Sequence, residues 1–193
     1  MSRAILLPAA GASSRMRGRD KLLKEVDGVA LLRRSAMRAL ATGAAVAVTL
    51  PLASARIAAL DGLRLTLLDI DATEGMAASL RAGGAWAEGL GTSALMIALP
   101  DMPDITTDDM TALFAAHDLA PATPLRATTE DGRPGHPVIL PQAVFPAVQR
   151  LSGDQGARAI LADLPPRLHS LPGQRALTDL DTPEAWTAWR EQS

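Results

Sequence analysis

Four basic residues that follow the first apolar segment are the residues most able to do chemistry. The stretch LPAAGASSRMRGRDKLL, which ends at Leu23, places Arg15, Arg17, Arg19 and Lys21 just beyond a run of small residues. An arginine guanidinium offers two donors at once to phosphate oxygens, and a lysine ammonium offers a compact charge. Cations in this arrangement could neutralise a polyphosphate group, and Arg15 and Lys21 are the candidate catalytic cations.

The run of small residues before these cations predicts a loop that a ligand can approach closely. Little side-chain bulk covers its main-chain N–H groups, which could bind phosphate oxygens. The candidate nucleotide-binding residues here are Ala9, Ala10, Gly11 and Ser13. Neither G-x-x-x-x-G-K-[ST] nor G-x-G-x-x-G occurs in this loop. An ordinary turn with exposed basic residues is the alternative interpretation.

Two groups of acidic residues could hold a metal ion. In LMIALPDMPDI (95–105), Asp101 comes just after an apolar segment, and Mg²⁺ prefers one or two carboxylates together with phosphate oxygens. A capping aspartate between two prolines is the alternative. The second group, TDLDTPEAW (178–186), contains Asp179, Asp181 and Glu184, but D-T-P-E is also a good helix start.

The elements that must position these residues alternate between apolar segments and amphipathic ones. We expect strands at 3–8, 45–51, 63–69, 93–100 and 125–129, and helices at 31–41, 52–60, 76–89 and 106–117. Beyond residue 130 we expect a short strand at 134–141, a helix at 153–164, short strands in RLHSL and RALTDLD, and a closing helix at 182–191. This order predicts an α/β fold: one domain over 1–193, with a mostly parallel sheet in a three-layer α/β/α sandwich.

Composition narrows the function further. Residues 1–40 contain nine basic and three acidic residues, a charge of +6, whereas the whole chain has a net charge of −2. A local positive field on an acidic protein suits a small polyanion, although a solvated basic face would look the same. Aromatic residues make up 3% and cysteine is absent, which argues against stacking on nucleic acid bases and against thiolate chemistry. No apolar run has membrane-span length and no signal peptide is evident, so we expect a cytoplasmic protein.

The opening stretch resembles the signature of nucleotidyltransferases with a Rossmann-like fold, the family that includes molybdenum cofactor guanylyl- and cytidylyltransferases. Their pattern L-x-[AG]-G-x-S-x-R-M-G, followed by a lysine, is matched by LPAAGASSRM and RGRDKLL, with Arg17 where glycine is usual. LPDMP resembles the family's metal-binding segment, and DLDTPEAW its C-terminal D-[IL]-[DN]-T-P-E segment. The resemblance implies that Asp101 and Asp181 bind Mg²⁺, with Asp179 in reserve.

Three further segments extend the resemblance along the chain. EGMAASLRAG (74–83) is similar to the segment that contacts the nucleoside, which implies a nucleotide contact for Ser79; a small helix residue is the alternative. GRPGHPVIL (132–140) and GDQGAR (153–158) are similar to elements of the cytidylyl branch. They imply that His136 and Arg158 bind the acceptor, although His136 could simply be a turn residue.

The resemblance implies Mg²⁺-dependent transfer of a nucleoside monophosphate, CMP from CTP being favoured, to the phosphate of molybdopterin or the molybdenum cofactor, with release of pyrophosphate. A molybdoenzyme or its chaperone would then receive the product. The alternatives are a cytidylyltransferase for a sugar or alcohol phosphate, a guanylyltransferase, and a non-catalytic nucleotide-binding module. Two retained acids argue against the last.

Overall fold

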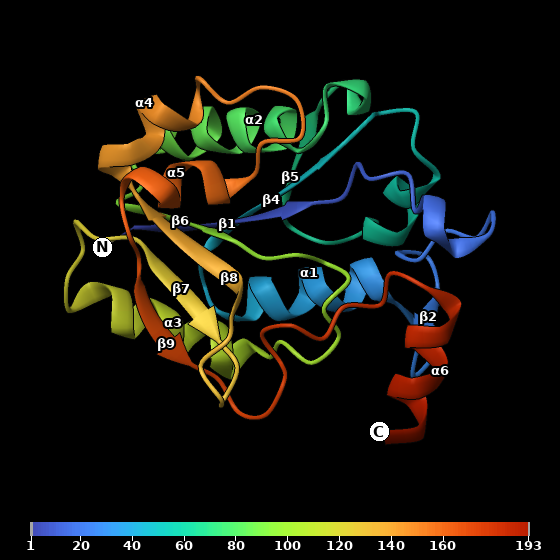
Figure 1. Cartoon of the computed structure of the whole chain (residues 1–193). Coiled ribbons are helices and arrows are strands. Elements are labelled where there is room, and N and C mark those ends of the chain that lie inside the picture. The colour runs from blue at the N-terminus through green and yellow to red at the C-terminus, as the bar shows by residue number, and fades with distance from the viewer. Residues whose placement is uncertain (1, 193) are drawn as a thin grey trace.

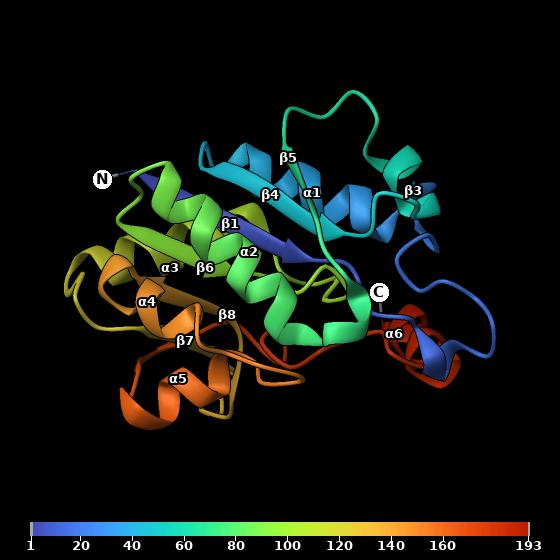
Figure 2. The ribbon, with the colours of Figure 1, turned by 90° about the horizontal axis from the view of Figure 1, so that it is seen from above.

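The computed structural model describes residues 2–192 and shows a seven-stranded sheet between layers of helices (Figures 1 and 2). The sheet strands are β1 (Arg3–Pro8), β4 (Ala45–Leu50), β5 (Thr66–Asp69), β6 (Ala94–Ile97), β7 (Leu125–Thr128), β8 (Pro134–Pro141) and β9 (Arg167–Ser170). A separate hairpin pairs β2 (Glu25–Val26) with β3 (Val29–Ala30). The helices are α1 (Leu31–Ala41), α2 (Met76–Gly89), α3 (Thr107–Asp118), α4 (Phe145–Val148), α5 (Ala157–Asp163) and α6 (Pro183–Gln192).

The strand order β5-β4-β1-β6-β8-β7-β9 confirms the predicted mostly parallel α/β sandwich. Strands β5, β4, β1 and β6 run parallel, and only β8 among the sheet strands of residues 2–192 is antiparallel to its neighbours. After β1 the chain moves to β4 on one side and later to β6 on the other. Ligands in open α/β sheets bind where the strand order reverses in this way, beyond the carboxyl ends of the strands.

Alternating residues of β1 feed two separate hydrophobic cores. Ile5 and Leu7 belong to the core beneath α1 and α3, whereas Ala4 and Leu6 belong to the core beneath α2, α4 and α5. Figure 1 shows these two helix layers above and below the sheet. Because successive side chains of a strand point to opposite faces, an almost wholly apolar β1 requires a cover on both faces.

Helix α2 packs against β1 at Gly83, where there is no room for a side chain. A Cβ built at Gly83 would lie 2.3 Å from Cδ2 of Leu6, and Gly83 is buried. The two glycines in this segment weaken the predicted helix by propensity alone. Here Gly83 is what allows the helix to pack on the strand.

We expect Gly83→Ala to lower the free energy of unfolding by about 1–3 kcal/mol, since the added methyl group overpacks a closed core. Gly89→Ala is the matched control, because a Cβ at Gly89, at the helix end, meets no atom within 4 Å. Urea unfolding of both variants checks the prediction. Equal stability of the two variants would contradict the close-packing argument.

Two predicted elements differ from those observed. The segment 52–60 was expected to be a helix, but it forms a 3₁₀ helix over Ala55–Leu60, capped by Ser54. RALTDLD was expected to be a strand and contains none. In this segment the Leu180 amide donates to the main-chain oxygen of Asp101 at 3.0 Å, and Leu180 packs with Trp186 in a small third core. Its buried apolar residues, Ala176 and Leu180, therefore pack locally, and the segment forms no strand.

Helix α6 is attached to the opening loop by that third core. Met16, Val26, Leu31, Leu180 and Trp186 are its buried members. It brings the segment that follows β1 and helix α6 together, as Figure 2 also shows. No helix within residues 2–192 is both long enough and apolar enough to cross a membrane.

Candidate nucleotide and acceptor site

A pocket of about 450 Å³ lies beyond the carboxyl ends of β1 and β6. It brings together most of the residues that the sequence singles out. Its lining includes Ala10, Gly11, Arg15, Lys21, Ser79, Asp101, Asp179 and Asp181. Segments that are 160 residues apart in the chain, at Lys21 and Asp181, thus meet at one edge of the sheet.

Lys21 lies between the two predicted metal ligands. Its Nζ donates to Oδ2 of Asp101 at 2.5 Å and also forms an ion pair with Asp181. Arg15 forms a second ion pair with Asp181, although 70% of the Arg15 side chain is exposed. Lys21 is predicted to contact phosphate, and in this structure its ammonium lies between two carboxylates, a position that favours a cation.

Burial and the neighbouring charges shift the pKa values of Lys21, Asp179 and Asp181. Burial opposes the charged form of Lys21, but Asp101 and Asp181 outweigh it and raise the pKa of Lys21. Burial likewise opposes ionisation of Asp181, yet Lys21 and Arg15 lower the pKa of that carboxyl. Asp179 is different: burial and then the charges of Asp181 and Asp101 raise its pKa. The shifts therefore favour the charged forms of Lys21 and Asp181 and the neutral form of Asp179.

The residues of the pocket suit a divalent cation. Four carboxylates line it, those of Asp101, Asp154, Asp179 and Asp181, against the two cations Arg15 and Lys21. This excess of negative charge would repel a triphosphate unless a cation accompanied it. Oδ1 of Asp101 is buried and has no hydrogen-bond partner within residues 2–192, so it is free to act as a ligand.

Two of the four carboxylates, those of Asp101 and Asp181, form ion pairs with the same ammonium of Lys21. No group of three or more His, Cys, Asp or Glu side chains that could hold a metal occurs in the described part of the chain. Mg²⁺ commonly takes one or two carboxylates and completes its octahedron with phosphate oxygens and water. The pair Asp101 and Asp181 matches that pattern.

Ala9 and Ser13 do not line the pocket but hold its loop in place. The anchor is Arg56, which is 6% exposed and which the sequence analysis did not identify. Its guanidinium donates to the main-chain oxygens of Ala9 and Gly11, the latter at 2.8 Å, and to Oγ of Ser13 at 3.2 Å. Its Nε donates to Oδ2 of Asp20 at 2.7 Å. One buried arginine thus determines the path of the loop.

The loop also contains two strained positions. Ser13 and Arg17 have φ values of 51° and 53°, a left-handed conformation that costs energy for residues other than glycine. Arg17 stands where the nucleotidyltransferase signature described above usually has glycine. The positive φ at this position explains why glycine is preferred there. Its Nη2 donates to Oε1 of Glu184 on α6 at 2.6 Å, so this arginine faces α6 and does not line the pocket.

The predicted acceptor residues line a second pocket of about 150 Å³, which shares Met76 and Leu99 with the first. His136 lies on β8 and Arg158 on α5. Gly135 makes the position of His136 possible, because a Cβ there would lie 1.8 Å from the main-chain oxygen of Ala176. The His136 amide donates to the same oxygen at 2.8 Å.

His136 is uncharged near neutral pH. Burial, and then the charge of Arg126, lower its pKa to about 4, although a hydrogen bond to the Ile97 backbone acts in the opposite direction. Its Nδ1 is buried without a hydrogen-bond partner in the described part of the chain. A neutral ring with one unused nitrogen is suited to hydrogen bonding with a ligand rather than to charge neutralisation.

This pKa predicts a loss of stability in mild acid. Between pH 6.5 and pH 4 the unfolded chain binds a proton at His136 that the folded chain does not, so stability falls as pH falls. We expect the wild type to lose about 2 kcal/mol more than His136→Gln between pH 7 and pH 5. Urea unfolding at both pH values measures the difference. Identical losses in the two proteins would contradict a buried, neutral His136.

The segment before α2 packs against the segment before α5, and the contact is made at Gly75. Gly75 has φ +71°, and a Cβ there would lie 2.5 Å from Oδ1 of Asp154. The Ala77 amide donates to the main-chain oxygen of Gly153 at 3.0 Å. Because of this contact Asp154 lines the pocket, a role that its position in a loop did not indicate.

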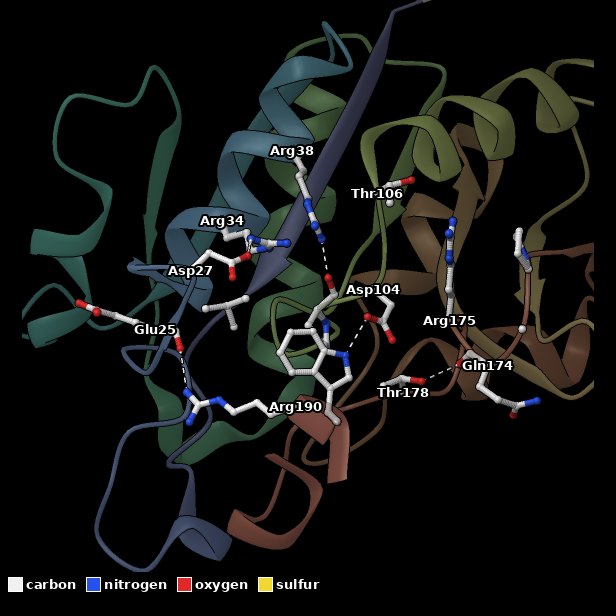
Figure 3. Close-up of a pocket in the computed structure, with 15 residues that line it drawn as sticks. Glu25, Asp27, Arg34, Arg38, Asp104, Thr106, Gln174, Arg175, Thr178 and Arg190 are labelled. Atoms are coloured by element: carbon white, nitrogen blue, oxygen red, sulfur yellow. Dashed lines mark hydrogen bonds and ion pairs between the residues drawn. The ribbon is translucent and has the colours of Figure 1, made fainter. Parts of the chain in front are cut away.

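A larger hollow of about 1020 Å³ is lined in part by Pro103, Asp104 and Thr106, which follow Asp101 in the chain (Figure 3). Its arginines are engaged by the protein itself. Arg38 donates to the main-chain oxygens of Pro103 and Ile105 at 2.5 and 2.8 Å, and Arg34 pairs with Asp27 at 2.8 Å. Figure 3 shows Arg38 directed at the loop that follows Asp101. These contacts fix the loop from behind.

The chain is similar to known proteins along most of its length. A model of the family described as MobA-like NTP transferase domain matches residues 4–170. The purine catabolism protein PucB of Bacillus subtilis (strain 168) is 34% identical over 91 residues, which are 47% of this chain and 42% of PucB. The matched stretch therefore spans less than half of that relative.

Solved structures share the fold. Rv0371c from Mycobacterium tuberculosis H37Rv has a TM-score of 0.81 and 25% identity, covering 99% of this chain and 98% of that one. Rv0371c in complex with manganese has a TM-score of 0.79 at 22% identity, with full coverage of both chains (100% each). A CMP:2-keto-3-deoxy-manno-octonic acid synthetase complexed with CTP has a TM-score of 0.77 at 15% identity, covering 100% and 98%.

Proposed function

Because the chain belongs to the MobA-like NTP transferase family, and is thus a nucleotidyltransferase, we propose that it transfers CMP from CTP to the phosphate of molybdopterin or of the molybdenum cofactor. The observation that carries the proposal is the meeting of Arg15, Lys21, Asp101 and Asp181 in one pocket. That pocket shares Met76 and Leu99 with a second one lined by His136. This arrangement supports a triphosphate site next to an acceptor site.

The reaction requires little covalent chemistry from the protein. A phosphate oxygen of the acceptor attacks the α-phosphorus of the triphosphate, and the bond from that phosphorus to the β-phosphate oxygen breaks to release pyrophosphate. The attacking oxygen is already an anion, so no strong base is needed. Catalysis then depends on positioning and on charge stabilisation.

The cations of the site exchange partners when substrate binds. Lys21 is held by Asp101 and Asp181 in this structure, and Arg15 by Asp181. A bound Mg²⁺, held by Asp101 and Asp181, would supply charge neutralisation at the α-phosphate. Lys21 and Arg15 would then turn to the phosphate oxygens and stabilise the leaving pyrophosphate. Main-chain N–H groups around Ala10 and Gly11 would orient the triphosphate.

The preference for cytosine rests on two features of the sequence. Ala10, which lines the pocket, stands where a glycine would leave more room for a purine, and G-H-P resembles the cytidylyl branch. A single methyl group gives modest discrimination, so GTP must be tested beside CTP. The product would be passed to a molybdoenzyme or its chaperone.

The test is pyrophosphate release with Mg²⁺ and each of CTP, GTP, ATP and UTP, with and without the molybdenum cofactor. We expect release with CTP and the cofactor together. Release with CTP and a sugar or alcohol phosphate would keep the chemistry and replace the acceptor, and release with GTP would replace the base. Tight triphosphate binding without release from any pair would overturn the proposal in favour of a binding module.

A further inference from the structure

Two arginines at the far end of the second pocket have no carboxylate partner among residues 2–192. Arg126 lies on β7 and is half-buried, and its Nε donates to the main-chain oxygen of Gly135 at 2.9 Å. Arg158 lies on α5 and is exposed. By contrast, Arg15, Arg34 and Arg175, which line the other two pockets, each pair with an Asp side chain. For Arg126 the single hydrogen bond at Nε fixes the side chain and leaves both Nη groups for another partner.

Arg126 and Arg158 both line the second pocket and the groove next to it. Burial, and then the charge of Arg158, lower the pKa of Arg126. Arg126 in turn lowers the pKa of His136, so its positive field reaches into the pocket. Two cations held together in a partly desolvated place are unfavourable until an anion lies between them.

Arg126 and Arg158 line two neighbouring pockets. On one side is the second pocket, whose walls include Leu80, Ile97 and Val138. On the other side is a groove of about 340 Å³, lined by Arg126 and Arg158 together with apolar side chains such as Leu161. Residues of β7 and of α5 thus line the same groove. A molecule that enters from the triphosphate pocket would therefore meet the two guanidinium groups with the end that does not react.

We propose that Arg126 and Arg158 bind an oxyanion group at the far end of the acceptor, so that this enzyme selects acceptors that carry a second anionic group besides the phosphate that reacts. The inference rests on the proposed function and deepens it by defining the acceptor. Arg126 becomes a specificity-determining residue, which no motif of the sequence indicated.

The rest of the pocket agrees with an acceptor of this class. The apolar walls suit an uncharged middle section, and Nδ1 of His136 offers a hydrogen-bonding atom to it. Two guanidinium groups match the planar pair of oxygens of a carboxylate or two oxygens of a tetrahedral ion. Sulfate, molybdate and acetate are therefore suitable probes, and comparing them separates a tetrahedral group from a carboxylate.

The first test is anion binding without turnover. Each probe is added to the whole ¹⁵N-labelled protein at constant ionic strength, and the Nε–Hε signal of Arg126 is followed by NMR. We expect saturable shifts with sulfate and molybdate or with acetate, and at least about tenfold weaker binding in Arg158→Gln. Arg150→Gln, which removes an exposed arginine elsewhere, is the matched control and should bind as the wild type does. No saturable shift with any probe would overturn the inference.

The second test separates this inference from the proposed function. In the pyrophosphate assay, Arg126→Gln and Arg158→Gln should each raise the acceptor KM about tenfold or more, with kcat and the KM of the triphosphate nearly unchanged. An unchanged acceptor KM would overturn the inference and leave the transferase function intact. If no acceptor supports release, the proposed function fails, and the anion titration still decides whether the arginine pair is a binding site.

Discussion

Asp101→Asn is expected to lower kcat about a thousandfold or more while weakening triphosphate binding less than about tenfold. The carboxylate of Asp101 has one oxygen on Lys21 and a second, buried oxygen with no partner in the described part of the chain. Asparagine keeps the shape and removes the charge. The interaction lost is the one that matters most when charge shifts from the acceptor to the leaving pyrophosphate.

The fold should survive this substitution, because the structural contact of Asp101 uses its main chain. The Leu180 amide donates to the main-chain oxygen of Asp101, and asparagine retains that oxygen. Lys21 retains its ion pair with Asp181. Loss of turnover without loss of stability is therefore the expected combination.

Asp104→Asn is the matched control for Asp101→Asn. Asp104 lies three residues further on, outside the pocket, and its Oδ1 accepts a hydrogen bond from Nε1 of Trp189 at 2.8 Å. Its kcat should stay within about a factor of three of the wild type, since Asp104 makes no contact with the pocket. Single-turnover pyrophosphate release gives the rate, and calorimetric titration gives the triphosphate Kd. Equal losses of rate and affinity in Asp101→Asn would contradict a role specific to the transition state.

The order of elements could be predicted from the sequence because the central strands are apolar on both faces. Strand β1 is an example, because Ile5 and Leu7 belong to one core and Ala4 and Leu6 belong to the other. RALTDLD was predicted wrongly for a related reason. Its alternation of apolar and polar residues imitates a strand, but Leu180 is buried under α6 and bonds to a loop.

The sequence predicts which residues lie in the site better than it predicts which side chains contact one another there. The motifs predict that Lys21, Asp101 and Asp181 lie together. Only the structure shows that Lys21 forms an ion pair with both carboxylates. Nor could the antiparallel insertion of β8 between β6 and β7 be derived, since it depends on long-range pairing and on Gly135 passing close to Ala176. Such contacts leave no periodic signal in the sequence.

Arg56 is the largest omission of the sequence analysis, and its replacement should have the largest structural effect. Arg56→Met is expected to lower the free energy of unfolding by about 2–4 kcal/mol, because Asp20 and the oxygens of Ala9 and Gly11 lose their donor. Methionine keeps the volume of the side chain, so cavity formation contributes little. Urea unfolding measures the change.

Arg56→Met should also weaken triphosphate binding, because Arg56 holds the loop that is expected to contact the nucleotide. With no guanidinium to hold the main chain of Ala9 and Gly11, the N–H groups beside them lose their fixed arrangement, and we expect the triphosphate Kd to rise about tenfold or more. Arg56→Lys keeps the charge but not the fork of donors; it should fold more stably than Arg56→Met and still bind triphosphate less well than the wild type. Arg64→Met, at an exposed arginine nearby in the sequence, is the control. If Arg56→Met unfolded and bound triphosphate as Arg64→Met does, the loop would be held by its own sequence and not by the buried arginine.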